Sequence, residues 1–189
     1  MEENKTAVAA MNYIPSKYMA NFDTPKSQEF SLPAPLMRYM INNPTGKFYA
    51  KIVGTCKYFY SIKRVFHFAV LNFVKNNDWT VCTNFDCPKR HDFELFKIPV
   101  KIWLAKGLQI DEKASLFPNL ASSLVSKLYR CDINQLILYS QKLTIKEFLF
   151  LTKNVDCFIF DNGYITEQDG TVLKLEKIIE YLPKLKSLS

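Results

Sequence analysis

The sequence contains only five glycines in 189 residues, and this scarcity argues against the glycine-rich loops that hold phosphate in nucleotide-dependent enzymes. A loop of the P-loop type has a second glycine five residues before a Gly-Lys pair. Gly46-Lys47 is the only such pair, and Ile41 stands where that glycine would be. We therefore expect no P-loop in this chain.

Long apolar runs and a secretory leader are also missing. A membrane-spanning helix needs about 20 consecutive apolar residues, whereas the longest apolar run, from Val65 to Val74, contains His67. Glu2 and Glu3 stand where a signal peptide carries basic residues. We therefore expect neither membrane insertion nor secretion.

The cysteines are odd in number and scattered. An odd set in a chain without a signal peptide is typical of reduced thiols, so we expect a cytoplasmic or nuclear protein. The five positions are Cys56, Cys82, Cys87, Cys131 and Cys157.

Metal and covalent chemistry have weak sequence support. Cys82, Cys87 and His91 follow the spacing C-x4-C-x3-H, which is not a standard zinc pattern, and a fourth ligand is not evident nearby. No local signature pairs a cysteine with a histidine as nucleophile and base. We expect no metal, no cofactor and no catalytic residue.

Positive charge exceeds negative charge, with a net charge of +7. A basic chain is compatible with nucleic-acid binding. The lysines are dispersed, however, and no basic block is longer than Lys63-Arg64 or Lys89-Arg90. Partnership with nucleic acid is therefore unlikely on sequence grounds and is kept as an alternative.

The N-terminal third divides into a polar tail and a helical segment. Residues 1–28 are expected to be a disordered tail. Residues 31–60 predict two helices, with Ser31 as N-cap and a break at residues 42–46. Apolar residues recur at helical spacing in both helices; they are Leu36, Met37, Met40 and Ile41, then Phe48, Ile52, Val53, Cys56, Phe59 and Tyr60.

The middle of the chain is less regular. The stretch RVFHFAVLNFV is compatible with a buried helix or with a strand, and a turn-rich segment follows it. We assign residues 63–99 to a linker or helical extension.

The C-terminal half, residues 100–189, contains an internal repeat. Residues 133–143 and 155–165, aligned 22 residues apart, both place large apolar side chains at offsets 0, 3, 5 and 10. These inward positions are Ile133, Leu136, Leu138, Leu143, Val155, Phe158, Phe160 and Ile165. The spacing is that of a leucine-rich repeat, in which each unit forms one strand and one helix. Gln141 and Gly163 stand where that pattern has Asn or Cys.

A repeat region of this kind buries its apolar faces by stacking neighbouring units. The side chains that alternate with the inward ones would line the open face of the strands and bind a protein substrate; they are Gln135, Ile137, Tyr139, Cys157, Ile159 and Asp161. A further unit begins at Leu185 and Leu188. The end, LPKLKSLS, is not a polar cap, so we expect a truncated product or a partner that covers Leu182, Leu185 and Leu188.

Residues 30–60 resemble an F-box. That motif opens on Leu-Pro, has a Leu three residues later and ends near Val-Cys-Lys followed by an aromatic residue. Leu32-Pro33, Leu36 and Thr55-Cys56-Lys57-Tyr58-Phe59 follow this order. With the repeats behind it, the chain resembles the divergent F-box-like proteins that are numerous in nematodes.

The resemblance implies an α/β protein with a small helical F-box-like module, residues 29–62, followed by a short irregular leucine-rich-repeat region. It also implies a non-catalytic adaptor of an SCF-type ubiquitin ligase, whose module binds a Skp-type adaptor and thereby a cullin complex. The residues expected to bind the Skp-type adaptor are Leu32, Pro33, Leu36, Met40, Ile41, Ile52, Val53, Cys56 and Phe59. The alternatives are a stand-alone repeat-based binding protein, a basic nucleic-acid-binding protein and an ordinary α/β domain whose first helices belong to its own core.

Overall fold

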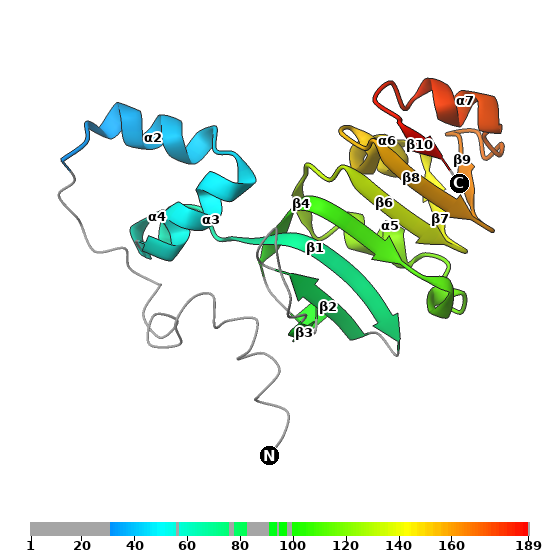
Figure 1. The fold of residues 1–189 in the computed structure, drawn as a ribbon, viewed down its shortest axis with the longest axis horizontal. Coiled ribbons are helices and arrows are strands. Elements are labelled where there is room, and N and C mark those ends of the chain that lie inside the picture. Colours follow the sequence, from blue (N-terminus) through cyan, green and yellow to red (C-terminus); the bar gives the residue numbers. More distant parts are fainter. Residues whose placement is uncertain are drawn as a thin grey trace, which may run out of the picture.

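The protein is a mixed α/β structure built on one large mixed sheet (Figure 1). This computed structural model describes residues 31–55, 57–75, 78–82, 91–93, 95–97 and 100–188. The sheet has eight strands in the order β10-β8-β6-β4-β1-β2-β3, and β5 also pairs with β4. The predicted tail, residues 1–28, lies outside the described residues.

Three helices precede the sheet: α2 (Ala34–Asn42), α3 (Gly46–Thr55) and α4 (Lys57–Ile62). The break between α2 and α3 falls at Asn43–Thr45, inside the segment predicted to interrupt the helix. The N-cap of α2 is Pro33 and not Ser31 as predicted, and a second proline occupies its first turn. Proline is tolerated there because the first backbone N–H groups of a helix have no intrahelical acceptor.

The assignment of residues 63–99 to a linker or helical extension was wrong. This range contains β1 (Val65–Lys75), β2 (Asp78–Cys82), β3 (His91–Phe93) and a 3₁₀ turn, Leu95–Lys97. β1 lies inside the sheet, parallel to β4 and antiparallel to β2. Because both faces of such a strand are covered, its sequence is an almost unbroken apolar run, which hides the alternation that marks a strand.

The strands that follow stack in parallel (Figure 1). They are β4 (Lys101–Ile110), β5 (Leu128–Cys131), β6 (Gln135–Tyr139), β8 (Cys157–Asp161) and β10 (Ser187–Leu188). Gln135 pairs with Cys157, an offset of 22 residues (157 − 135), which is the predicted repeat length. Cys157 pairs with Ser187, an offset of 30 (187 − 157), so the next unit is eight residues longer.

The units are completed by short elements behind the sheet. β7 (Lys142–Thr144) pairs with β9 (Tyr164–Thr166), again 22 residues apart. Helices α5 (Leu120–Val125), α6 (Ile145–Thr152) and α7 (Leu175–Glu180) and the 3₁₀ turn Glu112–Ala114 make up the rest. The structure therefore repeats strand, short strand and helix at the predicted spacing.

The main core lies between the sheet and α5, α6 and α7. The predicted inward residues of both repeats belong to it or pack against it, and all are fully buried apart from the half-buried Phe160. Each buried side chain of this size contributes about 1.5–3 kcal/mol. Leu182, for which an outside partner was expected, is buried within the chain itself.

Helix α3 covers part of the opposite face of the sheet. Tyr49 packs on Trp103 with ring centroids 5.4 Å apart, and Val65 joins the same cluster. The Tyr49 hydroxyl donates to the Lys63 carbonyl oxygen at 2.7 Å. The helical segment is thus attached directly to β1 and β4. In the described part of the chain, no helix has the length and apolar character needed to cross a membrane.

Candidate functional site

The first candidate site is the three-helix module α2–α4. Its helices are short and amphipathic, so their apolar stripes turn toward one another. Met37 and Ile41 from α2, Ile52 from α3 and Phe59 from α4 form a small buried core separate from the main one. The module therefore supplies its own interior from residues that were predicted to face a partner.

The predicted adaptor-binding residues consequently divide into groups. Ile41, Ile52 and Phe59 are buried in the module, and Met40 and Val53 pack against them partly exposed. Leu32, Pro33 and Leu36 are exposed, with 43% of Leu32 and 44% of Leu36 accessible to solvent. Cys56 lies outside the described residues. The structure thus keeps the opening of the motif accessible and buries much of the remainder.

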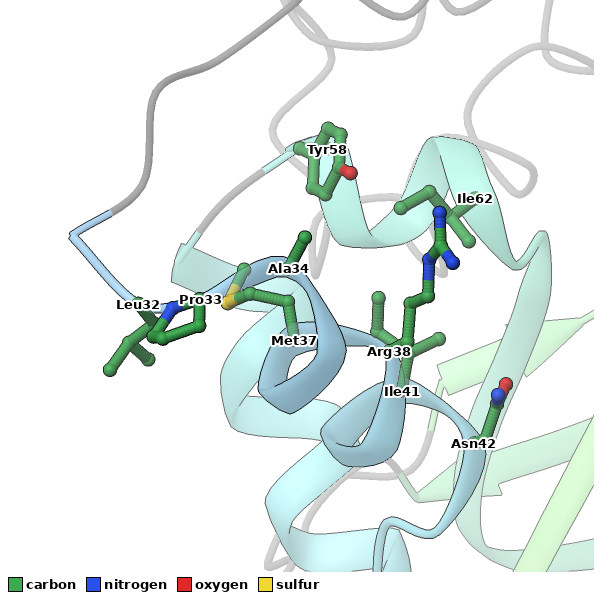
Figure 2. A pocket seen from close by; sticks show the side chains of 9 residues that line it. All are labelled: Leu32, Pro33, Ala34, Met37, Arg38, Ile41, Asn42, Tyr58 and Ile62. Atoms are coloured by element: carbon green, nitrogen blue, oxygen red, sulfur yellow. The ribbon is translucent and has the colours of Figure 1, made fainter.

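A groove of about 540 Å³ runs between α2 and α4. Figure 2 shows its two walls, with Pro33, Met37 and Ile41 on one side and Tyr58 and Ile62 on the other. Arg38 extends from α2 toward Ile62, so one cationic group stands over an otherwise apolar wall. A groove of this composition suits an apolar side chain of a partner, with an acidic or carbonyl group beside Arg38.

The second candidate site is the open face of the sheet. Leu136, Leu138 and Phe158 point into the core, so the alternating residues of β6 and β8 point away from it. The predicted substrate-binding residues therefore form three cross-strand pairs on the open face: Gln135 with Cys157, Ile137 with Ile159 and Tyr139 with Asp161.

The structure extends this face by residues that the sequence did not reveal. Gln109 of β4 pairs with Ile137, and Asn72 of β1 pairs with Gln109. One row therefore runs from Asn72 through Gln109 to the two isoleucines, with amides at one end and apolar side chains at the other. Register irregularities in β1 and β4 separate these strands from the regular repeat, so spacing alone gave no signal for them.

Cysteine chemistry finds little support among the described residues. Cys82, Cys131 and Cys157 are free thiols. Burial raises the pKa of the Cys131 thiol to about 12, which keeps it protonated and unreactive at neutral pH. Across the described ranges, no three His, Cys, Asp or Glu side chains are grouped to hold a metal ion. Cys87, one of the weighed zinc ligands, lies outside those ranges.

Known proteins add no further identification. Comparisons with protein-family models, with curated proteins and with solved structures found no match. The functional assignment therefore depends on the residues and geometry of this chain.

Proposed function

We propose that this protein is a substrate-recognition adaptor of an SCF-type ubiquitin ligase, with an F-box-like module in residues 29–62 and leucine-rich-repeat-like units behind it. The observation that carries the proposal is the exposed apolar opening of α2. Leu32, Pro33 and Leu36 have the order that the F-box resemblance requires, and all are exposed. Exposed apolar residues gathered at one place are typical of a protein-binding surface.

Two further features support the division of labour. The module has its own small core, so it presents these residues from a folded support. The open face of β6 and β8 offers a separate surface for a protein substrate, formed by the cross-strand pairs described above. Ubiquitin transfer would be carried out by partner proteins.

The test is co-expression with a Skp-type adaptor and measurement of co-purification. The informative variant is Leu32→Asp with Leu36→Asp, since both side chains are exposed and leave the module core intact. Substitution at Ile52 would be uninformative because it would disrupt that core. Loss of two apolar contacts should weaken binding at least about tenfold.

The matched control is Leu116→Asp with Leu149→Asp, which changes two exposed leucines outside the module. The proposal predicts capture by the wild type and by the control, and loss of capture by the α2 variant. A well-folded chain that captures no adaptor, or equal loss in both variants, would contradict it.

A stand-alone repeat-based binding protein is the second candidate. It is favoured by the burial of Ile41, Ile52 and Phe59 inside the module, which reduces the surface left for an adaptor. This candidate predicts no capture by the Skp-type adaptor and binding of a protein through Ile137 and Ile159 on the open face.

A further inference from the structure

Basic residues from three distant parts of the chain meet where β1, β4 and β5 begin. Lys63 and Arg64 immediately precede β1, and Lys101 is the first residue of β4. Lys127 precedes β5, and Arg130 lies within it. We call these five residues the basic rim; their dispersal along the sequence conceals that the fold gathers them.

The strand register places the rim within a small area. Val65 pairs with Lys101, and Ile102 pairs with Leu128. The Lys127 carbonyl oxygen accepts a hydrogen bond from the Ile102 N–H at 3.0 Å. Neighbouring strands lie roughly 4.8 Å apart, so β1, β4 and β5 span about 10 Å across the rim.

The charge of this area is one-sided. In the described segments 63–65, 101–103 and 126–132, five basic residues face one acidic residue, Asp132, which gives a net charge of +4 (5 − 1) against +7 for the whole chain. Asp132 forms an ion pair with Arg130 and accepts a hydrogen bond from the Trp103 indole. Such a local excess attracts anionic groups and speeds their encounter with the protein.

Two of the cations are held in place by aromatic rings. The Lys63 Nζ lies 4.6 Å from the ring centre of Tyr129, and the Arg130 Cζ lies 4.5 Å from that of Trp103. Trp103 is fully buried, so it provides a fixed support. Ordering these long side chains before a ligand arrives lowers the entropy cost of binding.

We propose that the basic rim binds an acidic segment of a partner protein. Side chains on one side of an extended segment recur about every 7 Å, so two or three carboxylates fit an area about 10 Å wide. Nucleic-acid surfaces that lack sequence preference combine a long basic track with several stacking aromatics. Here the exposed aromatic residue within the rim is Tyr129, and Lys63 already lies over its ring.

This surface is distinct from the adaptor-binding residues proposed above. None of its five residues lines the groove between α2 and α4, and none belongs to the exposed opening of α2. Loss of binding at the rim and loss of adaptor capture are therefore separable results.

The test uses the full chain and fluorescence anisotropy with a rhodamine-labelled polyglutamate peptide. An oligothymidylate of equal charge is the competing ligand, and polyglutamine is the uncharged one. The variant is Lys63→Glu with Lys101→Glu. The control is Lys146→Glu with Lys153→Glu, two exposed lysines on or next to α6 that give the same change in net charge. Circular dichroism verifies that both variants fold.

The expected result is peptide binding that weakens about tenfold in the rim variant, remains near wild type in the control and falls with added salt. Polyglutamine should not bind. Unchanged peptide binding by the rim variant, or equal weakening in the control, would overturn the proposal. Rim-dependent binding of oligothymidylate that is tighter than peptide binding would overturn the choice of partner and favour nucleic acid.

Discussion

At the scale of single residues, Gln141 and Gly163 explain how the two repeats fit together without the usual Asn or Cys. The Gln141 side chain is fully buried. Its Nε2 donates to the Phe117 carbonyl oxygen at 3.2 Å, and its Oε1 accepts from the Ala121 N–H at 2.9 Å. These bonds satisfy backbone groups of the preceding segment, which would otherwise be buried without partners.

Gly163 occupies the corresponding position in the second repeat, where no side chain fits. A Cβ there would lie 2.5 Å from the Gln141 carbonyl oxygen and 2.7 Å from the Phe160 ring. Departure from the repeat pattern at one position is thus matched by a departure at the other, because the two positions are neighbours in the stack.

Replacement of Gln141 tests this arrangement. Gln141→Leu keeps similar bulk but leaves the Ala121 N–H and the Phe117 carbonyl without their partner. Each unpaired buried group costs about 1–3 kcal/mol, so we expect the free energy of unfolding to fall by at least about 2 kcal/mol. Urea denaturation measures it. Gln135→Leu, on the open face, is the control, and equal loss in both variants would contradict the role of Gln141.

At the scale of elements, the helices of the repeat units differ in how they begin. Helix α6 has a capping box: the Glu147 N–H donates to the Thr144 Oγ1, and the Thr144 N–H donates to Glu147 Oε2 at 2.8 Å. Helix α7 begins after Lys174 without a side-chain cap. The additional eight residues of the second unit separate Thr166, the counterpart of Thr144, from the start of α7.

Removal of the cap should destabilise α6. Thr144→Ala removes the acceptor for the Glu147 N–H, and losses of this kind cost about 1 kcal/mol. Thr144→Ser keeps the hydroxyl and should cost much less. The measurement is the midpoint of chemical denaturation for both variants. If serine and alanine behave alike, the hydroxyl does not cap the helix.

At the scale of the whole molecule, the contact between α3 and the sheet is a buried junction. His67 of β1 lies edge-on to Trp103, with ring centroids 5.6 Å apart. A Cβ on Gly46, at the start of α3, would come within 2.5 Å of the His67 Nε2, so only glycine allows this close approach. The helical module and the sheet are therefore joined by close packing around one histidine.

This junction makes stability depend on pH. Burial lowers the pKa of His67 from 6.5 to about 4, although Asp132 acts in the opposite direction. As the pH falls from 6.5 to about 4, the unfolded chain binds a proton at this site and the folded protein does not. The His67 contribution to stability is thus complete above pH 6.5, decreases by about 3 kcal/mol at most as the pH falls to about 4, and is constant below that.

His67→Gln provides the measurement. The variant should lose much of the pH dependence of the free energy of unfolding between pH 6.5 and about 4. The chain has only two histidines, so His91→Gln is a direct control and should keep that dependence. A slope that survives in His67→Gln would assign the effect to other groups.

The sequence predicted the local features of this protein well. The repeat spacing identified β6, β8 and the helices that follow them, and it identified the inward side chains, because period and burial are local properties of a strand–helix unit. The pair of helices around residues 42–46 also followed from apolar spacing and a breaker segment. The F-box resemblance remains a prediction that binding must test.

The tertiary structure decided what depends on contacts between distant segments. Periodicity did not show that β1 is an inner strand, because a strand covered on both faces loses its alternation. Nor did it separate Leu36, which is exposed, from Ile52, which is buried, since both lie on apolar stripes. The basic rim exists only because strand register brings Lys63, Lys101 and Arg130 together. Amino-acid order fixed the repeating units by itself, whereas pairing across the sheet decided which residues meet and which remain accessible to a partner.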